Sequence, residues 1–280
     1  IETYAHHKEP ASHVFSFIPL FFEHQGETNM ALTATILEST PDSMHQVRVD
    51  LAAAHRLAHR FGFDDGIHNH FPLLVPGATD RFLVKAHGLL MSEITANNLI
   101  VVDTQGDVVE GSGTIERSAF CIHAAIHVRH PNAICVLHAH PPYSTWLADV
   151  EDGRLHMTNQ DIIRFHDRIA YDDGYEGADN EVGEQFASAM GDKDVLVSRN
   201  HGVTVVGATV AEAFYNLYYL ELACKRQYLM ATSGCKASVV PENISARTRQ
   251  LIDSEFATSA ILYFDALKRE LDRENPGYTA

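Results

Sequence analysis

Hydrophobic positions recur with helical spacing early in the chain. The stripe repeats every three or four residues and consists of Val47, Leu51, Ala54, Ala58 and Phe61. Thr40 can cap such a helix, Pro41 suits its first position, and Gly62 is the expected stop. The pattern therefore predicts an amphipathic helix that ends near Phe61.

Similar patterns predict five more helices, two of which carry capping signals. Thr158 is the expected cap of one, and Thr209 with Glu212 forms a capping box for another. The expected helices cover residues 114–128, 159–165, 181–190, 209–232 and 245–273. Short apolar runs between turn residues predict strands over 71–75, 81–84, 99–102, 107–109, 133–137, 194–198 and 203–206. Hairpins outnumber strand–helix–strand units, so we expect a single α/β domain with helices on a mainly antiparallel sheet.

Residues 1–30 differ from the rest because they show neither a helical period nor clear caps. We interpret them as an N-terminal arm or a leader and expect the domain to occupy residues 31–280.

Composition narrows the class of partner. The chain of 280 residues is 45% hydrophobic and has a formal net charge of −16, from 21 basic and 37 acidic residues. Acidic surfaces disfavour nucleic acid and anionic membranes, and no apolar run is long enough to span a bilayer. The four cysteines show no CxxC spacing. We therefore expect a cytoplasmic protein that binds neither nucleic acid nor membranes.

The most distinctive chemistry lies in His138 and His140, at the expected end of a buried strand. Side chains two residues apart on a strand point to the same side, so the two imidazoles could share one metal ion. Two surface histidines beyond the strand are the alternative. His201 lies in an Asn-His-Gly turn between two strands and could supply a third ligand. Three neutral imidazoles leave open positions on a divalent ion.

Other polar residues could line the same pocket. His68 and His70 form a second HxH pattern, although loop residues that bond the backbone would look the same. His123 shares a helix face with His127, and core packing is the simpler interpretation of that pair. Glu116 at the helix start and Tyr143 after the first HxH pattern could transfer protons.

At residues 42–234 the sequence resembles the class II aldolase/adducin family. The resemblance rests on Gly88-Leu89, NNLIVVD at 97–103, GDVVEG at 106–111, AFCIH at 119–123, HPNA at 130–133, VLHAHPPY at 136–143 and NHGV at 200–203. It implies a single α/β domain with a mainly antiparallel sheet between helix layers. It also implies homotetramers with active sites between subunits.

Carried over by position, the resemblance makes His138, His140 and His201 the metal ligands, with Zn²⁺ as the usual ion and Fe²⁺ as the next candidate. The family's catalytic glutamate position is Ala119 here, so Glu116, His70 or Tyr143 would have to move the proton. The family's phosphate ligands are also replaced. His68, His87, Phe71 and His123 are the expected substrate-binding residues, which indicates a non-phosphorylated oxo or hydroxy acid.

Three functions remain open at this point. The first is a metal-dependent lyase that cleaves a C–C bond next to a carbonyl, by aldol cleavage or decarboxylation. The second is a non-haem iron oxygenase acting on an aromatic 2-oxo or 2-hydroxy acid, because one branch of the family resembles such enzymes. The third is an adducin-like interaction module without chemistry. An isomerase of the same fold is a lesser alternative.

Overall fold

The computed structural model describes residues 41–130, 132–174 and 180–280. Within them, one sheet has the strand order β4-β3-β2-β1-β5-β8-β7-β6. The strands are β1 (Leu73–Leu74), β2 (Arg81–Lys85), β3 (Leu99–Asp103), β4 (Val108–Glu110), β5 (Cys135–Ala139), β6 (Ile169–Asp172), β7 (Val195–Ser198) and β8 (Gly202–Gly207). All neighbours pair antiparallel except β6 and β7, which are parallel. The expected fold class is thus confirmed.

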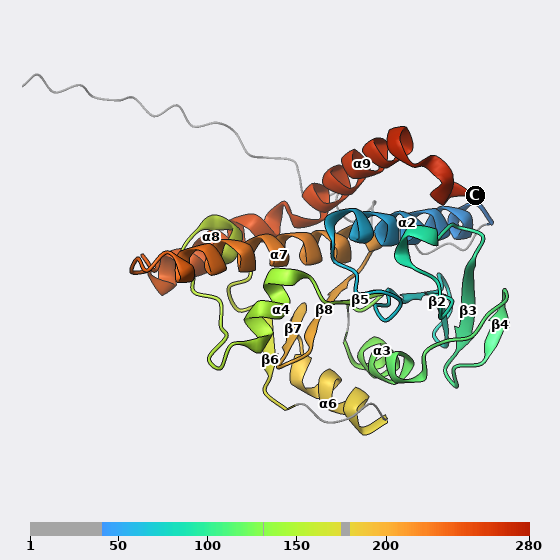
Figure 1. Ribbon diagram of the computed structural model, residues 1–280, viewed down its shortest axis with the longest axis horizontal. Coiled ribbons are helices and arrows are strands. Elements are labelled where there is room, and N and C mark those ends of the chain that lie inside the picture. The colour runs from blue at the N-terminus through green and yellow to red at the C-terminus, as the bar shows by residue number, and fades with distance from the viewer. Residues whose placement is uncertain (1–40, 131, 175–179) are drawn as a thin grey trace, which may run out of the picture. The chain divides into compact units, whose positions relative to one another are not determined.

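Helices cover both faces of this sheet (Figure 1). They are α2 (Pro41–Phe61), α3 (Arg117–Arg129), α4 (Pro142–Asp149), α5 (Gln160–Ile163), α6 (Asn180–Met190), α7 (Val210–Thr232), α8 (Glu242–Ser254) and α9 (Phe256–Glu274). Short 3-10 helices occur at Met91–Glu93 and Pro276–Thr279. Helices α2, α7 and α9 lie on one side of the sheet, and α3 and α6 lie on the other.

The alternation of side chains along β5 explains these two layers. Cys135, Leu137 and Ala139 face the main core, which they share with α2, α7 and α9. Val136 faces the other way and packs with residues of α3 and α6, such as Ile126 and Phe186. None of the helices within the described residues combines the length and apolar character that crossing a bilayer requires.

Three local expectations need correction. The last helix is divided at Glu255, whose backbone is no longer helical, so that α9 can bury Phe264 and Leu267 while α8 stays largely exposed. Asn159 caps α5 in place of Thr158, because its side chain accepts from two backbone N–H groups. The buried strand runs two residues further than expected, which places His138 inside β5. The expected N-terminal arm, residues 1–30, lies outside the described residues.

Candidate metal centre

His138 is the second-last residue of β5, and His140 follows the last one. His138 lies on the same face of β5 as Val136, and it is only 2% exposed. Its backbone also pairs with His70, through N–H···O contacts of 3.3 and 3.0 Å between the two residues. The second HxH pattern therefore lies directly beside the first, which the linear sequence did not show.

His201 reaches the same place from the turn between β7 and β8. Because β8 pairs with β5, this turn lies at the end of the sheet where His140 leaves β5. Asn200 has a positive φ of 53°, which an asparagine tolerates better than most residues. Gly202 follows, and a Cβ atom there would lie 2.4 Å from Cδ2 of His140. A side chain at position 202 would therefore occupy the space that the His140 ring needs.

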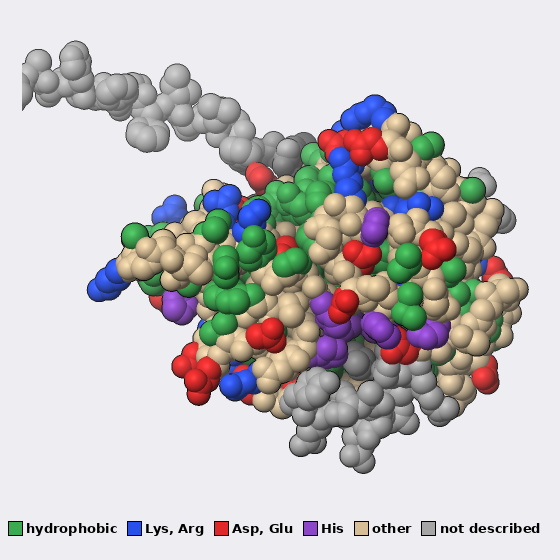
Figure 2. Space-filling model, in the orientation of Figure 1, with side chains coloured by type: hydrophobic (Ala, Val, Ile, Leu, Met, Phe, Trp, Pro, Cys, Tyr) green, Lys and Arg blue, Asp and Glu red, His purple; other side chains and the backbone are tan. Residues whose placement is uncertain are grey.

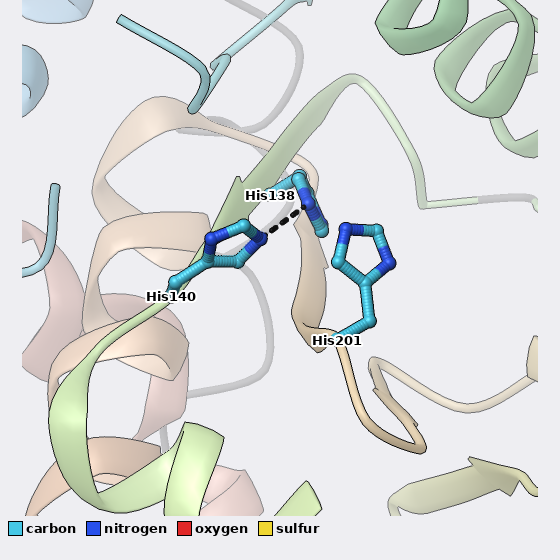
Figure 3. Close-up of side chains that lie close together, drawn as sticks. All are labelled: His138, His140 and His201. Carbon is cyan, nitrogen blue, oxygen red and sulfur yellow. Dashed lines mark hydrogen bonds between the residues drawn. The ribbon is translucent and has the colours of Figure 1, made fainter. Parts of the chain in front are cut away.

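The three imidazoles turn toward one another (Figure 3). Nε2 of His138 and Nε2 of His140 are 3.2 Å apart. The ring centroid of His201 lies 4.8 Å from that of His138 and 5.1 Å from that of His140. One nitrogen of each ring can be chosen so that all three lie within 4.8 Å of one another. Ligands of one zinc ion, each about 2.0–2.1 Å from the metal in a tetrahedron, are separated by about 3.3 Å.

The δ nitrogens of two rings have partners of their own. Nδ1 of His138 lies 3.2 Å from the hydroxyl oxygen of buried Thr204, and Nδ1 of His140 lies 3.5 Å from a carboxylate oxygen of Asp65. A carboxylate only accepts, so the Asp65 contact places the hydrogen of His140 on Nδ1 and a lone pair on Nε2, whereas the Thr204 hydroxyl, which can donate or accept, orients the His138 ring. The donor set of the triad thus fits a divalent cation held through ε nitrogens.

Burial keeps two of these rings neutral. It lowers the pKa of His138 well below 6.5, and the neighbouring histidines lower it further. Burial also lowers the pKa of His201, with His140 adding to the effect. A neutral imidazole is the form that binds a metal ion, so little proton release would oppose binding at neutral pH.

Glu116 forms a second cluster next to the triad. It lies just before the first residue of α3, in extended backbone, and its side chain does not cap the helix. One carboxylate oxygen, Oε2, is 3.8 Å from Nδ1 of His68, 3.9 Å from Nε2 of His70 and 3.9 Å from Nδ1 of His87. Figure 2 shows histidine side chains gathered on one face of the molecule with acidic side chains among them.

His70 connects this cluster to the triad. Its ring stacks on His138 with 5.4 Å between centroids, while Nε2 faces Glu116. On its other side, Nδ1 lies 2.8 Å from Nε2 of His123 on α3. His123 is therefore buried behind His70, where it can orient that ring.

The structure separates two other candidates from the centre. Phe71 is fully buried in the main core against His55, because it alternates with His70 and points to the opposite face. Its expected role in substrate binding is wrong. The Tyr143 ring packs against Tyr228 of α7, with 5.3 Å between centroids, and no described contact joins it to the triad.

Asp65 and Thr204 were not predicted. The contact between Asp65 and His140 could not be predicted from sequence spacing, because Asp65 lies in a loop far from His140 along the chain. Thr204 could have been found from strand pairing, because it lies opposite His138 in the register of β5 and β8.

Comparison with known proteins agrees with this architecture. The model of the Class II Aldolase and Adducin N-terminal domain matches residues 49–228. A Caulobacter vibrioides protein named "Putative aldolase class 2 protein" is 33% identical over 250 residues, covering 88% of this chain and 96% of its own. Alpha-adducin of Rattus norvegicus is 34% identical over 213 residues, which cover 72% of this chain but only 29% of adducin.

Solved structures show the same likeness. An aldolase II superfamily protein from Pseudomonas syringae superposes with a TM-score of 0.80 at 34% identity, covering 87% of this chain and 98% of that one. L-fuculose 1-phosphate aldolase from Glaciozyma antarctica gives a TM-score of 0.76 at 24% identity, over 88% and 98% of the two chains, and it supports the fold alone. The chain therefore belongs to the class II aldolase and adducin family.

Proposed function

We propose that this protein is a divalent-metal-dependent lyase that cleaves a C–C bond next to a carbonyl group, by aldol cleavage or decarboxylation. The substrate would be a non-phosphorylated oxo or hydroxy acid. The observation that carries the proposal is the convergence of three imidazoles, with Nε2 of His138 and Nε2 of His140 only 3.2 Å apart.

His138, His140 and His201 would hold the ion, and zinc or Fe²⁺ suits three neutral nitrogen ligands. The bound cation supplies Lewis-acid stabilisation of the negative charge that develops on a carbonyl oxygen when the neighbouring C–C bond breaks. Thr204 and Asp65 keep two of the rings in the orientation that this role requires.

Glu116 is the residue that we assign to proton transfer. In aldol cleavage, its carboxylate would take the proton of the substrate hydroxyl as that oxygen becomes a carbonyl and the C–C bond breaks. The same group would return the proton to the carbon of the other fragment. In decarboxylation of a 3-oxo acid, carbon dioxide would leave from the carbon next to the carbonyl, and Glu116, protonated from solvent, would donate the proton that takes its place on that carbon. Nitrogens of His68, His70 and His87 lie 3.8–3.9 Å from Oε2, so a small movement of these rings would bring them into hydrogen-bond distance of the carboxylate.

We infer a substrate without a phosphate group from the residues that stand at the family's phosphate-binding positions. Phe71 is buried in the core, and Asn69 is buried and bonds the backbone N–H of Asp65. His87 lies beside Glu116, which would repel a phosphate dianion. A carboxylate, with a single negative charge, would be repelled less than a phosphate dianion.

Metal analysis of protein purified anaerobically, without a histidine tag, tests the proposal first. The matched control is the His138→Ala/His140→Ala variant. We expect one equivalent of zinc in the wild type and none in the variant. Loaded protein should then release pyruvate from 4-hydroxy-2-oxo acids, or carbon dioxide from 3-oxo acids. Loaded protein that does neither would contradict the lyase.

Two other results would redirect the assignment. Stoichiometric iron, followed by oxygen uptake with an aromatic 2-oxo acid, would replace the lyase with an oxygenase, although no similar protein named above is described as one. Failure to acquire any metal would favour an adducin-like interaction module, which the 34% identity to alpha-adducin keeps as the second candidate. We also infer a homotetramer, which light scattering of the purified chain would test.

A further inference from the structure

A pocket lies between α3, β2 and the segment that leads into β1, next to the proposed metal centre. Its cavity volume is about 40 Å³, so a ligand ring would widen it on entry. His70 lines it and stacks on His138, so the pocket adjoins the triad. Its walls are mostly apolar, with Ile67, Pro72, Phe82, Val84, Ile115, Phe120 and Ala124.

The charge of the lining argues against an anionic ligand. Lys85 is the basic residue of the lining, and its ammonium donates to the carbonyl oxygens of Ile67 and Leu89, at 2.9 and 3.0 Å. Glu116 carries the opposite charge. Burial lowers the pKa of His127 to about 4, so that ring is neutral. A phosphate or a second carboxylate would find no surplus positive charge here.

Helix α3 presents one stripe of side chains to this pocket, at spacings of three, one and three residues: Phe120, His123, Ala124 and His127. Nδ1 of His127 is hydrogen-bonded to the carbonyl oxygen of Ala133. A carbonyl oxygen only accepts, so Nδ1 carries the hydrogen and Nε2 carries the lone pair.

That lone pair has no hydrogen-bond partner among the described residues, and the Nε2 atom is buried. Buried polar atoms in native proteins are nearly always paired, with protein, ligand or water. His127 also lines the pocket, so a ligand that moves the lining side chains apart could bring a donor to this acceptor.

The aromatic rings around this acceptor indicate the shape of a ligand that could carry the donor. The Phe82 ring lies 4.9 Å from the His127 ring and meets Phe120 edge-to-face at 6.3 Å. Aromatic walls in such arrangements favour a flat ring, which can stack or meet them by its edge. A hydroxyl on that ring would supply the missing donor.

We propose that this pocket binds an uncharged hydroxylated aromatic ring, whose hydroxyl group donates to Nε2 of His127. The site would hold the side chain of an aryl oxo or hydroxy acid while its carbonyl end lies at the triad. The role of the pocket in binding substrate rests on the proposed function. Its ability to bind an aromatic ring does not.

The test compares 4-methylphenol with toluene as probes, by ligand-observed NMR titration of the full chain, without metal and with zinc. The phenol should bind roughly tenfold more tightly than toluene, the difference expected for one hydrogen bond to a buried acceptor. His127→Phe, which removes the acceptor and keeps a ring, should abolish that preference and retain toluene binding.

A second variant covers the case in which His127→Phe does not fold. Ala124→Leu fills the pocket and should weaken both probes at least tenfold, while Val128→Ala, at a position 77% exposed on the same helix, should change neither. Equal binding of the two probes by the wild type, no binding of either, or binding unaffected by Ala124→Leu would overturn the inference. Because binding is measured without turnover, an inactive protein that still prefers the phenol would contradict the lyase and not the pocket.

Discussion

Replacing Gly202 with alanine should disturb the metal centre without removing any ligand atom. A Cβ atom at this position would lie 2.4 Å from Cδ2 of His140, 3.2 Å from its Nε2 and 2.8 Å from the carbonyl oxygen of Ala139. Gly202 does not have a positive φ, so the backbone itself would accept alanine. The perturbation is therefore steric and directed at one ring.

The size of the effect follows from these distances. Non-bonded carbon atoms prefer separations of about 3.5–4.0 Å, so the ring and the new methyl group must move apart by roughly 1 Å. A shift of that size separates Nε2 of His140 from Nε2 of His138, which now lie 3.2 Å apart. Misorienting a ligand typically weakens metal binding about 10- to 100-fold, and overpacking destabilises a fold by about 1–3 kcal/mol.

Zinc affinity measured by competition with a chromophoric chelator gives the first readout, and urea unfolding of the metal-free chain gives the second. In a His140→Ala background, Gly202→Ala should destabilise the fold less, because only the contact with the carbonyl of Ala139 remains. A Gly202→Ala protein that binds zinc as tightly as the wild type would refute the proposed arrangement of His140 and the β8 turn.

Three further outcomes are expected. Thr204→Val should weaken zinc binding about 10-fold in the chelator assay and Thr204→Ser should not, because only serine keeps the hydroxyl that contacts Nδ1 of His138; equal affinities would contradict an orienting role. Glu116→Gln should lower kcat by about 10²- to 10⁴-fold while zinc content stays at one equivalent, and an unchanged kcat would remove Glu116 from proton transfer. Burial lowers the pKa of His55 from 6.5 to about 3. As pH falls from about 6.5 toward 3, His55 therefore binds a proton in the unfolded chain but not in the folded one. The free energy of unfolding should fall over that window by up to about 1.4 kcal/mol per pH unit, and His55→Gln should flatten the slope; identical slopes for the wild type and the variant in urea titrations would contradict this.

Much of the architecture was predictable because local patterns and tertiary packing agree. The stripe from Val47 to Phe61 became α2, and the capping signal at Thr209 became the start of α7, where the Thr209 hydroxyl accepts from the N–H of Glu212. The single helix expected over 245–273 failed at Glu255, where no glycine or proline marks the break. There, packing of α9 on α7 overrides a continuous helical pattern.

The candidate site divides in the same way. By itself, the sequence determined that His138 and His140 share one face of a strand and that His201 lies in a turn, because side-chain alternation is a local property. Only the tertiary structure decided that His70 pairs with His138, that Glu116 lies among three imidazoles, and that Phe71 points into the core. Those relations depend on which strands become neighbours and in which register, and register comes from the burial of whole faces rather than from any short stretch of sequence.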